Sequence, residues 1–280
     1  MTGICLYAGG PRALRILPIA LYGVSRVWKG PVFVALGGMG KEVGKTLDSA
    51  GVLNGVDAGW IEGGDKTDAW KRKIACHVDV YPFDINIYYD MDHVWTRYLD
   101  PEAFDELESA ATTISRPGMT TGLARKAAVG MLTGGRLESV PHVNGGFLAV
   151  RAGGQAVENV ARLMKDGASS GVYFYDEDVI GVGMTEGWVE EASVEWSAML
   201  PRGRSGPVNG AMATHASRGR FKHMSEWRIL AAETFENDFL GCASNPDIFG
   251  LDRVYMDTLL NENRIRSRLG GGVARVHRLR

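Results

Sequence analysis

The sequence has few cysteines, and this excludes two classes of small protein. The chain of 280 residues contains three, Cys5, Cys76 and Cys242. They lie far apart, without the paired spacing of a disulfide framework or of a zinc site. We therefore expect free thiols that are mostly buried.

The sequence also lacks a long hydrophobic run. The apolar segment 16–22 is interrupted by Pro18 and flanked by arginines, so it is too short to cross a bilayer. No small-residue cleavage site follows it. We expect no membrane span and a cytoplasmic protein.

The sequence also lacks an excess of positive or of negative charge. The formal net charge is -2, with 45% hydrophobic and 23% charged residues, which is ordinary globular composition. Such a balance argues against a surface built throughout for nucleic acid. Basic residues nevertheless gather in two late stretches, which are either solvated or a site for a polyanionic acceptor. These are Arg202, Arg204, Arg218, Arg220 and Lys222, and then Arg264, Arg266, Arg268, Arg275, Arg278 and Arg280.

Short apolar runs alternate with segments of helical spacing along the chain, which predicts βαβ units and a mostly parallel sheet. We take the chain as one domain. Strands are expected at 3–8, 31–36, 56–61, 83–89, 146–150 and 172–175, and helices at 13–28, 41–50, 66–77, 155–165, 225–235 and 251–260.

Two aspartates, Asp90 and Asp92, follow the predicted strand 83–89. Loops at the carboxyl ends of strands form the ligand crevice of open α/β sheets. Carboxylate oxygens are ligands for Mg²⁺ or Mn²⁺, and such a cation neutralises the charge of a departing diphosphate. An isolated Asp-x-Asp is also typical of a solvated turn or a helix cap.

The segment Tyr81–Asp92, with the sequence YPFDINIYYDMD, resembles the "PFD…YLDAD" block of glycogenin-like and related bacterial glycosyltransferases of the GT-A type. The resemblance extends over roughly residues 31–222. It includes a basic helix before the block (Lys71, Arg72, Lys73), an N-x-G strand entry (Asn144, Gly145, Gly146), an acidic step (Asp176 to Asp178) and a late His215 near Lys222.

The resemblance implies roles for these residues. Asp90, Asp92 and His215 would bind Mn²⁺ or Mg²⁺, and Lys73, Asn144, Gly145 and Gly146 would bind the substrate. Met91 replaces the small middle residue of the family, and His215 lacks the usual G-x-K-P-W continuation. A hydrogen-bonded loop histidine and a tight glycine turn are the alternatives. His93 is set aside because the strand pleat would point it elsewhere.

Asp178 is the candidate catalytic carboxylate, either as a base toward the acceptor or as a stabiliser of an oxocarbenium-like state. It follows an apolar run and precedes a helix-like segment. The same position suits a helix N-terminal cap.

Together these features predict a GT-A-like, Rossmann-related α/β fold, with a mixed, mostly parallel sheet flanked by helices and a C-terminal helical extension. Residues 1–100 would bind the nucleotide-sugar donor, 101–225 the acceptor, and 226–280 would form the helical extension and basic tail. The predicted function is metal-dependent transfer of a hexose or pentose from a UDP- or GDP-sugar. The acceptor is left open between a glycan and a modified DNA base, as are the stereochemistry and the oligomeric state.

Two other functions remain open. Residues 32–46 resemble a strand entering a P-loop, but the glycine required five positions before Gly44 is Met39. A P-loop-like NTPase is thus a distant alternative, and a catalytically silent sugar-nucleotide-binding protein is another.

Overall fold

The computed structural model describes residues 1–9, 16–37, 57–61, 69–113, 123–170, 174–201, 204, 206–216 and 224–237. The predicted helices at 41–50 and 251–260, the P-loop-like glycines and most of the basic residues of the C-terminal third lie outside these ranges.

In the described part of the first half, strands and helices alternate as predicted, while residues 38–56 between β2 and β3 lie outside the described ranges. Strands β1 and β4 are buried along almost their whole length, as is typical of parallel strands covered on both faces. Strand β1 pairs in parallel with β2 and β4, and β2 pairs in parallel with β3. The elements are β1 (Thr2–Gly9), α2 (Leu17–Val27), β2 (Val32–Gly37), β3 (Asp57–Ile61), α4 (Ala69–Asp79) and β4 (Ile85–Tyr89).

The second half extends the same sheet. Strand β7 lies antiparallel between β4 and β6, and β8 pairs in parallel with β6. The strand order is β3-β2-β1-β4-β7-β6-β8, so the sheet is mixed and mostly parallel, as predicted. The elements are a 3-10 helix η2 (Pro101–Phe104), β6 (Ser109–Thr113), α5 (Leu123–Leu132), β7 (Val143–Arg151), α6 (Gln155–Ser170), α7 (Asp176–Glu186) and β8 (Glu190–Glu191).

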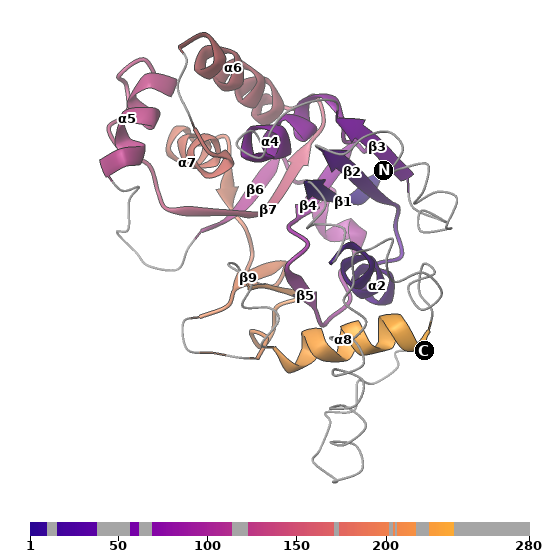
Figure 1. Ribbon diagram of the computed structural model, residues 1–280. Coiled ribbons are helices and arrows are strands. Elements are labelled where there is room, and N and C mark those ends of the chain that lie inside the picture. Colours follow the sequence, from indigo (N-terminus) through magenta and orange to yellow (C-terminus); the bar gives the residue numbers. More distant parts are fainter. Residues whose placement is uncertain are drawn as a thin grey trace.

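A second, three-stranded sheet lies beside the large one. Strand β10 (Ala213–His215) lies between β5 (His93–Trp95) and β9 (Ser197–Met199). Helix α8 (Ser225–Glu236) packs against α2, close to this small sheet (Figure 1). The predicted C-terminal helical element at 225–235 is confirmed.

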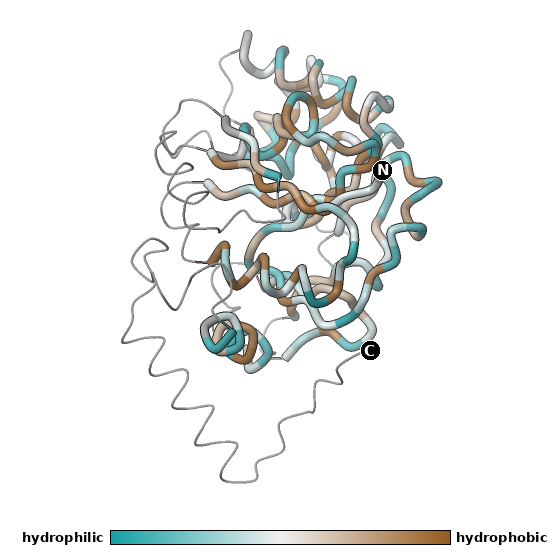
Figure 2. The backbone as a smooth tube through the Cα atoms, turned by 90° about the vertical axis from the view of Figure 1, so that its right-hand side faces the viewer, coloured by the Kyte–Doolittle hydropathy of each residue, from teal (hydrophilic) through white to brown (hydrophobic). Residues whose placement is uncertain are grey.

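The two faces of the large sheet bury separate cores. On β1, Ile4 and Leu6 face a core shared with α2, α8 and the small sheet, whereas Cys5 and Tyr7 face α4. Figure 1 shows α4, α5, α6 and α7 gathered on one side and α2 and α8 on the other. Hydrophobic and hydrophilic stretches alternate along the helices in Figure 2, as expected when one helix face meets a core.

Helix α7 differs from the sequence-based expectation. A strand was predicted at 172–175, but Phe174 and Tyr175 are not part of a strand, and residues 171–173 lie outside the described ranges. The helix begins at Asp176, so the three acidic residues fill its first turn. The amide of Tyr175 donates to the Asp178 carboxylate, which satisfies a backbone donor at the start of the helix.

The cysteines and the helix lengths bear on two of the expectations from the sequence. Cys5 and Cys76 are free and buried, as predicted, while Cys242 lies outside the described residues. None of the described helices combines the length and apolar character that crossing a bilayer requires.

Phe147 provides a test of the core next to the large sheet's centre. Its side chain is fully buried and its ring centroid lies 5.0 Å from that of Tyr89, its cross-strand partner. Truncation in Phe147→Ala should lower the free energy of unfolding by about 3–5 kcal/mol, because it removes buried surface and leaves a cavity. Urea unfolding measures this. Val194→Ala, at a position 71% exposed, should change it by less than about 0.5 kcal/mol, and equal losses would contradict this core.

Candidate functional site

The site is built around the turn that follows β4. Asp90 comes directly after the last residue of this strand, as predicted, and Asp92 directly precedes β5. The backbone amide of Asp90 donates to the carbonyl of Gly146 over 2.7 Å, which fixes the turn against β7. The two carboxylates therefore stand where the chain passes from the large sheet into the small one.

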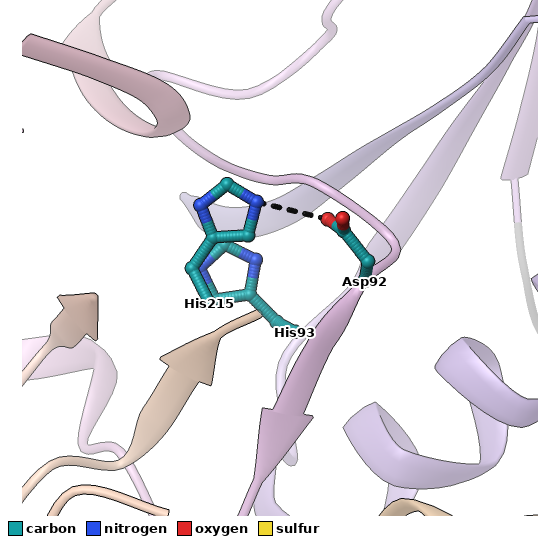
Figure 3. A group of neighbouring side chains, drawn as sticks. All are labelled: Asp92, His93 and His215. Atoms are coloured by element: carbon teal, nitrogen blue, oxygen red, sulfur yellow. Dashed lines mark ion pairs between the residues drawn. The ribbon is translucent and has the colours of Figure 1, made fainter. Parts of the chain in front are cut away.

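His215, the last residue of β10, brings an imidazole to these carboxylates. Its Nε2 lies 3.0 Å from Oδ1 of Asp92 and 3.7 Å from Oδ2 of Asp90, as Figure 3 shows for the Asp92 contact. The histidine is 3% exposed. The structure thus brings together the three residues predicted to bind a cation.

The electrostatics of the pair follow from this contact. Burial by itself raises the pKa of Asp92, but the protonated His215 ring outweighs it and lowers the pKa to about 2. Burial likewise lowers the pKa of His215, yet the carboxylates of Asp92 and Asp90 raise it above its ordinary value. Asp92 is accordingly ionised at neutral pH.

Lys73 enters the cluster from α4. Its Nζ lies 2.6 Å from Oδ2 of Asp176 and 3.1 Å from Oδ1 of Asp90. Although burial alone lowers the pKa of this ammonium group, the two carboxylates raise it, so Lys73 is charged. The hydroxyl of Tyr88 also donates to Oδ1 of Asp90. One oxygen of Asp90 is thus held by Lys73 and Tyr88, while the other faces His215.

Asn144 determines how the His215 ring is protonated. Its Oδ1 accepts the Gly146 amide over 2.8 Å, which identifies this atom as the oxygen, and lies 2.6 Å from Nδ1 of His215. Because an amide oxygen only accepts, Nδ1 carries a proton. Nε2 carries a second proton while it contacts the ionised Asp92, and loss of that proton would leave a lone pair facing both carboxylates, which is the usual arrangement of a metal-binding histidine.

The two glycines after Asn144 allow this close packing. A Cβ at Gly145 would lie 2.1 Å from Oδ2 of Asp176, and one at Gly146 would lie 2.4 Å from the His215 ring. Any side chain at either position would displace a group of the cluster. The Asn-Gly-Gly sequence therefore has a steric role here, and its predicted contact with substrate stays a prediction.

Asp178 has a different environment from the cluster. Its side chain is fully buried, Oδ1 accepts from Nε of Arg125 at 2.8 Å and lies 2.7 Å from Nη2 of the same guanidinium, and Oδ2 accepts the Tyr175 amide at 2.8 Å. Burial raises the pKa of Asp178 in spite of Arg125. Both oxygens have the bonding of a capped helix start, so the catalytic role of Asp178 stays a prediction.

The site contains three residues to which the sequence patterns assigned no role. Asp176 is the member of the acidic triplet that reaches Lys73. Tyr88 shares a strand face with the position of Asp90, a period-of-two signal that could have indicated it. His93 was expected to point away, yet its ring stacks on that of His215, because the turn at Asp90–Asp92 redirects the chain before β5 begins.

Comparisons with known proteins establish the fold. No protein-family profile matches the chain, and no curated protein sequence does either. Solved structures do. The galactosyltransferase LgtC, in complex with donor and acceptor sugar analogues, superposes with a TM-score of 0.52 at 13% identity, covering 81% of this chain and 95% of that one. The apo-form glycosyltransferase GlyE of Streptococcus pneumoniae TIGR4 gives 0.51 at 13%, covering 85% and 64%. The GT-A-like fold is therefore confirmed.

The Gly146 contact can be tested by adding one methyl group. Gly146→Ala should displace the His215 ring or Asn144 and weaken Mn²⁺ binding at least about 10-fold, since supporting contacts orient metal ligands. Gly153→Ala is the control for the glycine-to-alanine change, because nothing lies within 4 Å of its Cβ position, although its positive φ of 68° adds local strain. Titration with Mn²⁺ measures both. Unchanged affinity in Gly146→Ala would contradict the described packing.

The Arg125 contact should matter for stability. Arg125→Ala would leave the buried Asp178 carboxylate without its partner and should cost about 3 kcal/mol of unfolding free energy. Arg136→Ala breaks an ion pair of a half-exposed arginine with Glu186 and should cost less than about 1 kcal/mol. Denaturant unfolding at neutral pH compares them, and similar small losses would show that Asp178 does not depend on Arg125.

Proposed function

We propose that this chain is a metal-dependent glycosyltransferase that uses a nucleotide diphosphate sugar as donor. The observation that carries the proposal is the convergence of Asp90, Asp92 and His215 at the carboxyl end of β4, in a fold of the GT-A type. LgtC, which shares this fold, was solved with donor and acceptor sugar analogues. Ligands of open α/β sheets bind at this edge.

The donor set of the site suits a hard or borderline divalent cation. Two carboxylates and an imidazole whose Nε2 faces them match Mn²⁺ and also accommodate Mg²⁺. Asp90, Asp92 and His215 would hold the ion. When bound, it supplies positive charge that stabilises the diphosphate leaving group.

The remaining residues of the cluster would bind and orient the sugar-nucleotide donor. Lys73 offers a charged ammonium group beside Asp90 and Asp176, and together with Asn144, Gly145 and Gly146 we assign it to the donor side of the site. Within the acidic first turn of α7, Asp178 remains the candidate catalytic carboxylate, although Arg125 and Tyr175 donate to its oxygens. Asp176 pairs with Lys73 beside the proposed cation site, and we add it as a second candidate.

We further propose that residues 1–100 bind the donor and 101–225 the acceptor, with 226–280 as a helical extension and basic tail. The large sheet runs through both halves, since β4 pairs with β7. The acceptor is a glycan or a modified DNA base. Arg204 is the described member of the first basic stretch, and its side chain is exposed.

Hydrolysis assays distinguish the alternatives. In the presence of Mn²⁺, a transferase should slowly hydrolyse one sugar nucleotide from a panel of UDP- and GDP-sugars. A P-loop-like NTPase should instead release phosphate from ATP or GTP. A silent sugar-nucleotide-binding protein should do neither.

Asp92 offers the sharpest test of the proposed function. Asp92→Asn should lower Mn²⁺-dependent donor hydrolysis at least about 100-fold, because it removes a charged oxygen from the cation site. The variant also loses the ion pair with the buried His215, so its melting curve is recorded in parallel and activity is compared at a temperature where it is folded. Asp105→Asn, an exposed aspartate, is the matched control and should keep full activity. Full activity of Asp92→Asn with unchanged Mn²⁺ dependence would refute the role.

A further inference from the structure

His93 lies directly behind the proposed cation site. It is the first residue of β5 and the cross-strand partner of His215 on β10. The two rings are nearly parallel, with an interplanar angle of 8° and a centroid separation of 4.6 Å, and Figure 3 shows one lying over the other. His93 is 1% exposed, so protein rather than water holds its ring in place.

Both ring nitrogens of His93 have partners. Nδ1 lies 2.8 Å from the backbone carbonyl of Asp90, and Nε2 lies 3.1 Å from Oγ of Ser197 on β9. A carbonyl only accepts, so Nδ1 carries the proton and donates. Nε2 of the neutral ring then accepts the Ser197 hydroxyl. Burial, together with the neighbouring His215, lowers the pKa of His93 well below its usual value, in agreement with a neutral ring.

These contacts connect His93 to two of the three proposed ligands. Through its Nδ1 proton it holds the backbone of Asp90, and through the stacked ring it defines the plane of His215. Ser197 anchors its other side to the third strand of the small sheet. A shift of His93 would therefore move both a carboxylate-bearing turn and an imidazole.

We propose that His93 is a positioning residue of the cation site, which holds the His215 ring and the Asp90 turn in the geometry that binds the ion. The proposal rests on the proposed function, because it takes Asp90, Asp92 and His215 as the ligands. Supporting contacts of this kind typically change metal affinity about 10- to 100-fold when they are removed.

A direct ligand role for His93 is the competing arrangement. Ligand atoms of Asp92, His93 and His215 all lie within 4.8 Å of one another. Against it, Nδ1 is committed to the Asp90 carbonyl and Nε2 to Ser197. The substitution His93→Phe separates the two roles, because a phenyl ring can stack on His215 but cannot bind a metal.

The experiment measures Mn²⁺ binding directly, by the electron paramagnetic resonance signal of free Mn²⁺ in titrations of the full chain at one pH. His93→Ala should bind Mn²⁺ about 10- to 100-fold more weakly than the parent. His93→Phe should recover most of that loss, because it restores the stack on His215 and lacks only the hydrogen bonds to the Asp90 carbonyl and to Ser197. His142→Gln, which removes a histidine outside the cluster, should bind as the parent does. Melting curves without metal identify any variant that fails to fold.

Each other outcome has a distinct meaning. Parent-like affinity in His93→Ala would overturn the positioning role while leaving the proposed function intact. Equal losses in His93→Ala and His93→Phe would show that the stacked ring does not hold His215 in place, and would overturn the proposal as stated. Absence of Mn²⁺ binding by the parent chain would refute the metal dependence in the proposed function, and the positioning role with it. Recovery in His93→Phe alone, with parent-like melting of both variants, supports the proposal.

Discussion

The site depends on a single turn, at which the chain leaves the large sheet after β4 and enters the small sheet at β5. The amide of Asp90 is bonded to the carbonyl of Gly146 on one side, and its own carbonyl accepts from His93 on the other. The turn therefore couples two sheets whose strands come from distant parts of the chain. Asp90 and Asp92 owe their orientation to this coupling.

Charge compensation organises the residues around that turn. Three carboxylates, those of Asp90, Asp92 and Asp176, meet the cations of Lys73 and, when protonated, His215. Buried charges are stable only when they are paired, so each group constrains the placement of the others. The same concentration of oxygen and imidazole ligands is what a divalent cation requires, which is why the arrangement supports the proposed chemistry.

The first turn of α7 divides its acidic residues between two tasks. Asp176 reaches the Lys73 ammonium group, whereas Asp178 caps the helix and pairs with Arg125 on α5. Residues two apart on a helix point in different directions, so neighbours in sequence serve different partners. The glycines at 145 and 146 let β7 approach both Asp176 and His215.

The sequence by itself determined the alternation of strands and helices, the position of Asp90 and Asp92 after a buried strand, and the glycine pair that follows Asn144, because these are local patterns of hydrophobicity and turn chemistry. Only the tertiary structure decided that His215 meets Asn144, 71 residues away, that His93 returns to stack on it, and that Asp176 rather than Asp178 joins Lys73. Those contacts arise from strand pairing and helix packing between distant segments, and no local spacing encodes which side chains such pairing brings face to face.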